Sequence, residues 1–321
     1  MGKFALQIFA FAASLLLVSC GGRGSSGSQA AVEARKFPPM PSVPSVMTDR
    51  NEAYEYIVSK YWDAFLEGSY TCDSTLVNGV PTGEVEKALG TYVTLVGRCS
   101  HPFGKKAVGD LFKKLEVYAE ANPSSNVFPF FAKNMEKYLY DPNSPVRDED
   151  LYQPFVSGLA VSDLVPEEMK PAYSHDAAMC ALNQVGTKAA DIVFTDLKGR
   201  RRNLHGIKAD HTLLFFTNPG CPACREIIGS IEGNQAIARD IQAGKLAVVN
   251  IYIDQEIGKW KEHAKDYPAT WYSGYDQDYV VRTDVTYNVR AIPSLYLLDG
   301  EKKVVLKDAP PEKVIDYLEF I

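Results

Sequence analysis

Two cysteines lie in a context that suits thiol chemistry. Cys221 and Cys224 are separated by two residues in the segment 211–226, HTLLFFTNPGCPACRE. The apolar run before them is short and bounded by turn residues, which predicts a buried strand, and a helical pattern begins at residue 225. We therefore expect Cys221 at a helix N-terminus, where the helix dipole and free backbone N–H groups favour a thiolate. That thiolate can attack a disulfide, and Cys224 can resolve the mixed disulfide.

A cysteine pair with this spacing is also half of a structural zinc site. Such a site needs four ligands, commonly two pairs of cysteines or one pair with spaced histidines. The sequence has no second pair of this kind, and His205, His211 and His263 are not at ligand spacing. The strand before the cysteines and the helix after them favour the redox interpretation.

The C-terminal part of the chain, from about residue 185, resembles the thioredoxin-like domain of the TlpA/ResA family, the membrane-tethered thiol-disulfide oxidoreductases of the bacterial envelope. The resemblance is carried by ADIVF at 190–194 with Asp196, Gly199 and Leu204, by CPAC at 221–224, and by YNVRAIPSLYLLD at 287–299.

This resemblance implies a thioredoxin-like α/β fold, with a central mixed sheet and flanking helices. It also implies that Pro293 follows a cis peptide bond and lies against the cysteine pair, and that the backbone of Ile292 pairs with a substrate chain. An X–Pro bond in the cis form is uncommon in folded proteins, so the structure can test it. The implied activity is thiol-disulfide exchange through Cys221 and Cys224 with protein thiols or disulfides, and the resemblance favours the reductase direction. It requires no organic cofactor and no metal.

The sequence departs from the family at three positions around the pair. Gly220 stands where family members usually have tryptophan, and Phe215 stands where thioredoxin has a buried aspartate. Ile227 stands where TlpA/ResA proteins often have glutamate, and Glu226 is one residue away, which on a helix points about 100° away. The sequence therefore identifies no acid/base group that serves Cys224.

Two other classes of protein share some of these features. A peroxiredoxin-type peroxidase has the same fold, but its pattern requires threonine and proline where this chain has Asn218 and Leu214. A non-enzymatic binding lipoprotein can hold the cysteine pair as a permanent structural disulfide. An exposed and readily reduced pair favours the enzyme, whereas a buried and reduction-resistant pair favours the binding protein.

The composition is that of a globular protein with about two domains. The chain has 321 residues, of which 46% are hydrophobic, and a formal net charge of −6. Residues 200–202 form its only basic cluster, which we expect at an exposed turn. The acidic balance argues against nucleic acid as a partner, because a nucleic-acid interface needs a clustered basic excess.

The N-terminus is typical of export. Residues 1–19 predict a signal peptide, with Lys3 before a short apolar run. The ending Leu-Val-Ser before Cys20 resembles a bacterial lipobox and implies that Cys20 becomes lipidated, although a plain secreted protein is the alternative. Residues 20–47 then form the lipid anchor and a linker. No acidic residue stands at Gly21 or Gly22, which by analogy with known lipoprotein sorting patterns favours the outer membrane over the inner membrane. The expected location is its periplasmic face.

Residues 48–183 predict an all-helical domain. Asp49 and Glu52 form a capping-box pattern before a broad apolar face, which extends to Leu66. Five further helices are expected, at 83–96, 105–121, 126–140, 148–161 and 167–182. The segment 138–147 resembles a domain of unknown function that precedes thioredoxin-like domains in some envelope lipoproteins. We hypothesise that this domain is a docking surface for an envelope electron donor or acceptor.

Three further cysteines remain, an odd number for an oxidising compartment. Cys72 and Cys99 are the most reasonable structural pair. Cys180 is expected to be a buried thiol, with a resolving role as the alternative.

Residues 184–321 predict the thioredoxin-like domain. We expect a hairpin at 191–204, one helix at 221–243, a central strand at 246–253, an antiparallel pair at 294–298 and 303–306, and a final helix at 311–320. The segment 254–284 is interpreted either as a wall of the substrate groove or as a helical insertion packed by its aromatic residues.

Overall fold

The computed structural model describes residues 34–320. The predicted signal peptide, the lipidation at Cys20 and the first part of the linker lie outside the described residues. Within the described range, no helix is both long and apolar enough to cross a membrane.

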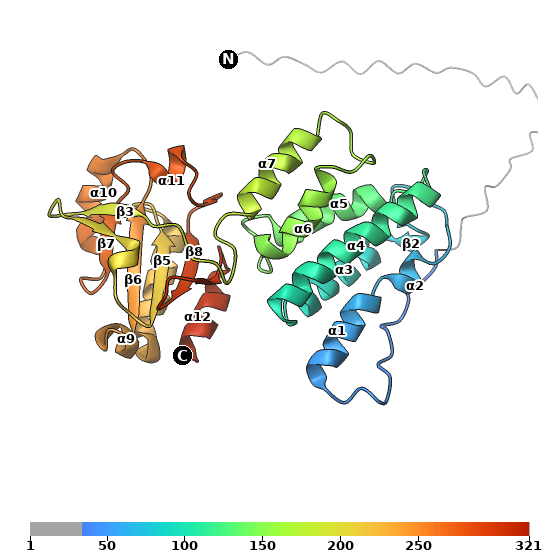
Figure 1. The fold of residues 1–321 in the computed structure, drawn as a ribbon, viewed down its shortest axis with the longest axis horizontal. Coiled ribbons are helices and arrows are strands. Elements are labelled where there is room, and N and C mark those ends of the chain that lie inside the picture. The colour runs from blue at the N-terminus through green and yellow to red at the C-terminus, as the bar shows by residue number, and fades with distance from the viewer. Residues whose placement is uncertain (1–33, 321) are drawn as a thin grey trace, which may run out of the picture. The chain divides into compact units, whose positions relative to one another are not determined.

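The N-terminal region is helical, as the periodicity predicts (Figure 1). Asp49 is the N-cap of the first helix, and its carboxylate accepts hydrogen bonds from the backbone N–H groups of Asn51 and Glu52. The predicted first helix is divided in two by a break after Lys60, and the other five are confirmed within a few residues. The helices are α1 (Arg50–Lys60), α2 (Asp63–Leu66), α3 (Thr82–Val96), α4 (His101–Ala121), α5 (Val127–Leu139), α6 (Glu149–Leu159) and α7 (Lys170–Cys180).

The helical region also contains a short hairpin, β1 (Leu76–Val77) and β2 (Val80–Pro81), that the periodicity does not predict. Its turn is Asn78-Gly79, and both residues have positive φ, +47° and +75°. Asn-Gly is the strongest short-range signal for such a turn, so the sequence did contain the information. The buried Asn78 side chain donates to the carbonyl of Phe65 at 2.7 Å.

Part of the predicted linker is packed against the helical region. The Arg35 guanidinium donates to the carbonyl of Phe65 at 2.7 Å and lies 4.2 Å from the centroid of the Tyr70 ring. The Phe37 ring contacts Trp62 edge-on at 5.6 Å between centroids. The linker therefore meets the folded region at Arg35, earlier than residue 47 where we predicted its end.

The C-terminal region contains a seven-stranded mixed sheet in the order β4-β3-β7-β6-β5-β8-β9. The central strand, β6, is parallel to its neighbour β5, and β8 runs antiparallel to β5. The strands are β3 (Val193–Asp196), β4 (Arg201–Asn203), β5 (His211–Phe216), β6 (Leu246–Tyr252), β7 (Tyr272–Tyr275), β8 (Ser294–Asp299) and β9 (Val304–Leu306). The two predicted hairpins and the predicted central strand are confirmed.

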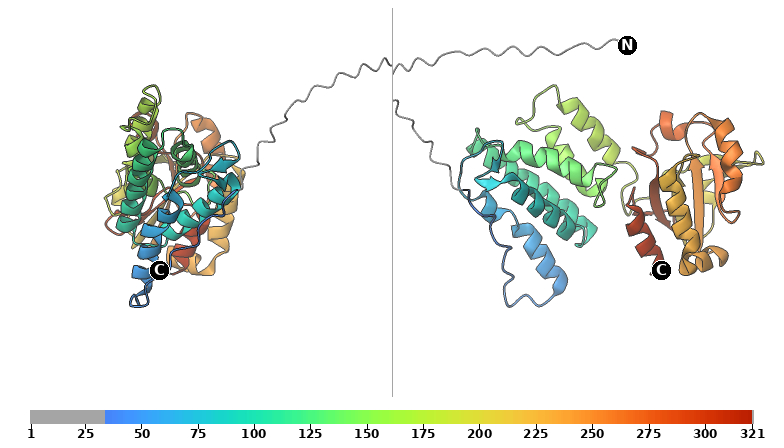
Figure 2. Two further views of the ribbon diagram at one scale, coloured as in Figure 1. Left: turned by 90° about the vertical axis from the view of Figure 1, so that its right-hand side faces the viewer. Right: turned by 180° about the vertical axis from the view of Figure 1, so that it is seen from behind.

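Both faces of this sheet are covered (Figures 1 and 2). Along β5, Leu213 and Phe215 face one core with residues of α8 (Pro222–Gly233), α9 (Gln235–Gln242) and α12 (Pro311–Glu319). Leu214 and Phe216 face the other core, which includes a residue of α11 (Val280–Thr283). This alternation is the pleat of a strand that is buried on both sides. The fold is therefore thioredoxin-like, as predicted.

Two local predictions for this region were wrong. The single helix expected at 221–243 is two helices, because the Asn234 side chain accepts from the N–H groups of Ala236 and Ile237 and caps a new helix. The segment 254–284 is not a purely helical insertion, because it contributes β7 to the sheet between β3 and β6. Its helix α10 (Ile257–His263) is packed through the fully buried Trp260, as one of the two interpretations expected.

The expected pairing of Cys72 with Cys99 was also wrong. Neither forms a disulfide within the described residues, and each thiol lies near a backbone carbonyl of its own segment. Cys180 is a fully buried thiol, as expected, and burial raises the pKa of Cys180.

Candidate functional site

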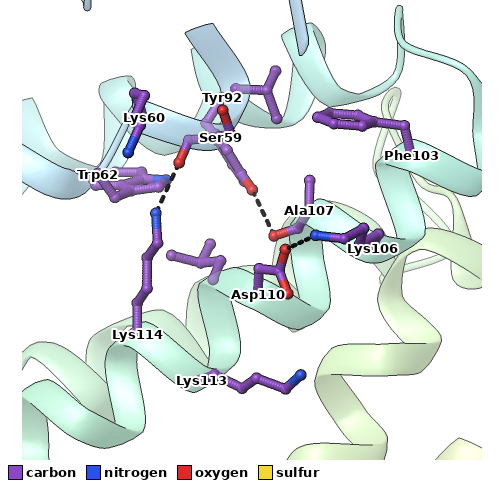
Figure 3. Close-up of a pocket in the computed structure, with 12 residues that line it drawn as sticks. Ser59, Lys60, Trp62, Tyr92, Phe103, Lys106, Ala107, Asp110, Lys113 and Lys114 are labelled. Carbon is purple, nitrogen blue, oxygen red and sulfur yellow. Dashed lines mark hydrogen bonds and ion pairs between the residues drawn. The ribbon is translucent and has the colours of Figure 1, made fainter. Parts of the chain in front are cut away.

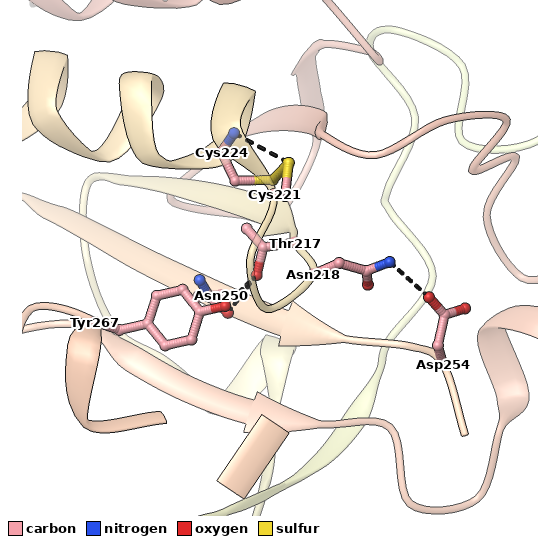
Figure 4. The surroundings of a disulfide bond; sticks show 7 residues. All are labelled: Thr217, Asn218, Cys221, Cys224, Asn250, Asp254 and Tyr267. Carbon is pink, nitrogen blue, oxygen red and sulfur yellow. Dashed lines mark hydrogen bonds between the residues drawn. A yellow bond between two sulfur atoms is a disulfide. The ribbon is translucent and has the colours of Figure 1, made fainter. Parts of the chain in front are cut away.

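The cysteine pair lies where β5 leads into α8, as the sequence predicts (Figure 4). Cys221 is the N-cap of α8, and its Sγ accepts the backbone N–H of Cys224 at 3.1 Å. The two residues are joined by a disulfide, with their Cα atoms 5.3 Å apart. Cys221 is partly exposed, whereas Cys224 is only 2% exposed. An incoming sulfur atom can therefore reach Cys221 and not Cys224.

The loop before the pair explains one departure from the family pattern. Gly220 has a φ of +76°, in the region that favours glycine over residues with a side chain. The backbone N–H of Cys221 donates to the carbonyl of Asn218, which closes this turn. Asn218 is held in turn by a 2.8 Å hydrogen bond from its side-chain amide to Asp254 (Figure 4). A tryptophan at position 220 would strain the turn.

The second predicted element of the site is the segment that ends at Pro293. The Ile292–Pro293 peptide bond is cis, as the resemblance implies. Phe216 is paired with Ser294 across β5 and β8, so Pro293 lies beside the end of the strand that leads to the cysteines. Ile292 and Cys221 both pack against the core that includes Cys224. The structure thus brings the predicted residues together, while their roles in catalysis and substrate binding stay predictions.

A buried polar chain lies beside the pair, and the sequence did not lead us to it. The Thr217 hydroxyl donates to Asn250 Oδ1 at 3.0 Å and lies 3.2 Å from the Tyr267 hydroxyl (Figure 4). Because a threonine hydroxyl has one proton, Tyr267 is the donor of the second bond. Burial raises the pKa of Tyr267, which keeps this proton on the phenol.

Asn250 is fully buried, and its Nδ2 has no partner among the described residues. It occupies the position in β6 that pairs with Phe215, the residue that stands where thioredoxin has aspartate. A single polar residue in the otherwise apolar run LAVVNIYI was the available signal. The site therefore has neutral polar groups on this side of the cysteines.

A cavity of about 430 Å³ opens beside the cysteine pair. Both cysteines line it, together with Arg225 of α8 and with His263 and Tyr267 from the segment after β6. The interpretation of 254–284 as a wall of the groove is consistent with this lining. The same segment also packs through Trp260, the one part of the helical-insertion interpretation that the structure confirms.

Side chains from the helical region reach the segment before Pro293. Glu149, at the start of α6, is 1% exposed and accepts a hydrogen bond from Asn288 Nδ2 at 2.7 Å. Its second oxygen lies 3.6 Å from Lys307 Nζ. Burial raises the pKa of Glu149 to about 7, although the charges of Lys307 and Arg290 oppose this shift.

The raised pKa gives a testable pH dependence. An unfolded glutamate has a pKa of about 4.3, so between about pH 4.3 and pH 7 the folded chain binds more protons at Glu149 than the unfolded chain does. The free energy of unfolding therefore falls as pH rises through this window. We expect Glu149→Gln, which cannot titrate, to show a smaller fall between about pH 5 and pH 7. Urea unfolding at both pH values measures the difference, and equal falls in the two proteins would contradict it.

A second cavity, of about 380 Å³, lies in the helical region among α1, α3 and α4 (Figure 3). Its polar groups largely bind one another: Lys114 donates to the carbonyl of Ser59 at 2.8 Å, and Lys106 pairs with Asp110. The Tyr92 hydroxyl donates to the carbonyl of Ala107 at 3.3 Å. None of its lining residues is a cysteine, so it lies apart from the redox site.

Comparison with known proteins gives the following relatives. The family model for a domain of unknown function, DUF5106, matches residues 19–183, just over half of the chain. A thioredoxin-like protein from Bacteroides caccae has 31% identity and a TM-score of 0.73, covering 87% of this chain and 97% of that one. The C-terminal domain of an uncharacterized protein from Bacteroides fragilis has 43% identity and a TM-score of 0.41, covering 42% of this chain and 97% of that one.

The thioredoxin domain of a thiol-disulfide oxidoreductase from Bacteroides vulgatus has 23% identity and a TM-score of 0.37, covering 42% of this chain and 96% of that one. No curated protein matches the sequence. The match to the family model and the similarity to the Bacteroides caccae protein together cover the helical region and the sheet. The chain therefore belongs to the DUF5106 family and has a thioredoxin-like fold in its C-terminal region.

Proposed function

We propose that this protein is a thiol-disulfide oxidoreductase that acts on protein substrates through Cys221 and Cys224. The observation that carries the proposal is the asymmetry of the pair: an accessible sulfur at the N-terminus of a helix and a buried sulfur one turn further on. The N-terminal position stabilises a thiolate at Cys221. The resemblance of the segment that ends at Pro293 to the family's substrate-binding segment supports a protein chain as the substrate.

In the reducing direction, the reaction proceeds in two exchange steps. The Cys221 thiolate attacks one sulfur of a substrate disulfide, a Cys221–substrate bond forms, and the second substrate sulfur leaves as a thiolate. Cys224, as a thiolate, then attacks Cys221 Sγ. The disulfide of the structure forms again and the first substrate sulfur is released. Two electrons pass from the pair to the substrate, and a thiol donor must reduce the pair for the next cycle.

Several finer features belong to the same proposal. We assign the protein to the TlpA/ResA type and propose that it acts as a disulfide reductase. Its anchor is the lipidated Cys20, and its location is the periplasmic face of the outer membrane. Its partners are protein thiols or disulfides and an envelope electron donor or acceptor. The resemblance of the motifs and the pattern around Cys20 support these assignments.

The reduction potential of the pair tests the function directly. We would equilibrate the chain from residue 34 onward, which keeps the Arg35 contacts, in thiol buffers of graded potential. A midpoint near about −270 mV supports a reductase, whereas one near about −120 mV indicates a dithiol oxidase. A Cys221→Ser variant identifies which thiols titrate.

The alternative function has a distinct result in the same experiment. A pair that remains oxidised below about −300 mV is a structural disulfide. That result would contradict the proposed enzymatic function and favour a non-enzymatic binding lipoprotein.

A further inference from the structure

The segment before Pro293 is fixed by the helical region through buried hydrogen bonds. Asn288, 7% exposed, donates to the Glu149 carboxylate at 2.7 Å and lies 3.5 Å from the Tyr140 hydroxyl. Both acceptors belong to the helical region, about 140 residues earlier in the chain. The backbone four residues before Ile292 is therefore tied to the start of α6.

Arg290, two residues before Ile292, is held from three sides. Its guanidinium lies 4.2 Å from the centroid of the Tyr140 ring. It donates to Asp308 at 2.8 Å, and its Nε is 3.9 Å from Glu149. Arg290 thus contacts the helical region by a cation–π interaction and an ion pair at once.

The far side of the cis peptide bond is fixed by the same carboxylate that holds Arg290. Asp308 accepts a 2.7 Å hydrogen bond from the Ser294 hydroxyl. Arg147, from the loop before α6, donates to the carbonyls of Asp308 and Ala309 at 2.9 and 3.1 Å. Residues on both sides of Ile292–Pro293 are therefore joined to one buried network that begins in the helical region.

An apolar interface would join the two regions without the desolvation cost of these charges. Directional bonds between buried charged groups instead favour one geometry of the segment. The cysteines are on α8, which takes no part in this network. Loss of the network would therefore move the backbone of Ile292 more than it moves the sulfur atoms.

We infer that the helical region positions the substrate-binding segment 288–293, and that Glu149 is the positioning residue through its bond to Asn288. The inference rests on the proposed function and gives the domain of unknown function a role in it. The helical region acts here on the binding of the substrate chain, and the exchange chemistry belongs to Cys221 and Cys224.

The test compares two disulfide substrates with the chain from residue 34 onward. Insulin presents a peptide chain to the segment 288–293, whereas 5,5′-dithiobis(2-nitrobenzoic acid) presents none. Insulin is assayed with dithiothreitol as the reductant, and the small disulfide is assayed in a single turnover with pre-reduced protein freed of dithiothreitol. We expect Glu149→Ala to raise the KM for insulin about tenfold, the equivalent of one charged hydrogen bond. The rate with the small disulfide and the reduction potential of the pair should change far less. Glu149→Gln keeps an oxygen that can accept from Asn288 and should restore most of the affinity.

A matched control is Glu116→Ala. Glu116 is half-buried on α4 and accepts a 2.6 Å hydrogen bond from Ser162, so its loss perturbs the helical region without reaching the segment before Pro293. We expect no change in the KM for insulin.

Three results would overturn the inference. An unchanged KM for insulin in Glu149→Ala would show that the segment 288–293 does not depend on Glu149 for its position. Equal losses of activity with both substrates would show that the substitution destabilises the protein generally. If Glu149→Ala does not fold, Asn288→Ala removes the same bond from the other side, and an unchanged KM there has the same meaning. Failure of the proposed function gives a different result, because the unmodified chain would then not accelerate the reduction of insulin.

Discussion

Replacing Cys221 by serine is expected to lower the rate of disulfide reduction by at least about 1,000-fold. The serine hydroxyl is not ionised at neutral pH, and it cannot form a mixed disulfide with the substrate. Replacing Cys224 by serine should have a different result. Cys221 can still attack a substrate, but no second sulfur releases it, so a covalent Cys221–substrate complex accumulates. Turnover of insulin measures the first effect, and non-reducing electrophoresis detects the complex in the second.

The matched control for both variants is Cys99→Ser. Cys99 is a partly buried free thiol on the helical region, and its Sγ lies 3.5 Å from the carbonyl of Leu95. This variant should keep full turnover and trap no substrate. Activity that survives Cys221→Ser and disappears in Cys99→Ser would assign the chemistry to a different thiol.

The largest effect on stability is expected at Lys307. Its side chain is 2% exposed and lies 3.0 Å from the fully buried Asp150, and it also donates to the carbonyl of Cys180 at 2.7 Å. Lys307→Ala leaves Asp150 and Glu149 without this cation. Removing one partner of a buried ion pair costs about 3 to 5 kcal/mol, so we expect a loss of that size in the free energy of unfolding. Urea denaturation followed by far-UV circular dichroism measures it.

Lys303 provides the control, four residues away. It pairs with Glu301 at 2.7 Å, but the two side chains are 50% and 74% exposed. Exposed pairs contribute about 0 to 1 kcal/mol, so Lys303→Ala should be nearly neutral. Similar losses at the two positions would show that burial of the Lys307 network contributes nothing.

Much of the fold followed from local patterns in the sequence. The apolar face after Asp49 and the strand-to-helix change at Cys221 are both determined by neighbouring residues. The cis bond at Pro293 followed from a motif.

The features that the sequence did not predict were of two kinds. Asn234 is a local signal that we did not use, since an asparagine after a glycine can cap a new helix.

The second kind depends on contacts between distant parts of the chain. Tyr267 reaches Thr217 across 50 residues, and Glu149 reaches Asn288 across 139. No spacing rule links such pairs, because only the folded chain brings them together. The sequence therefore predicted the two cysteines but not the polar groups that surround and support them.

The packing of Arg35 sets a geometric limit on where the protein can work. If Cys20 carries the lipid anchor, only residues 21–34 separate the bilayer from the folded region that begins at Arg35. A peptide of that length spans at most about 50 Å. The cysteine pair then operates in a thin layer next to the bilayer. A soluble partner has to diffuse to this layer in three dimensions, whereas a partner anchored in the same leaflet meets it by lateral diffusion in two.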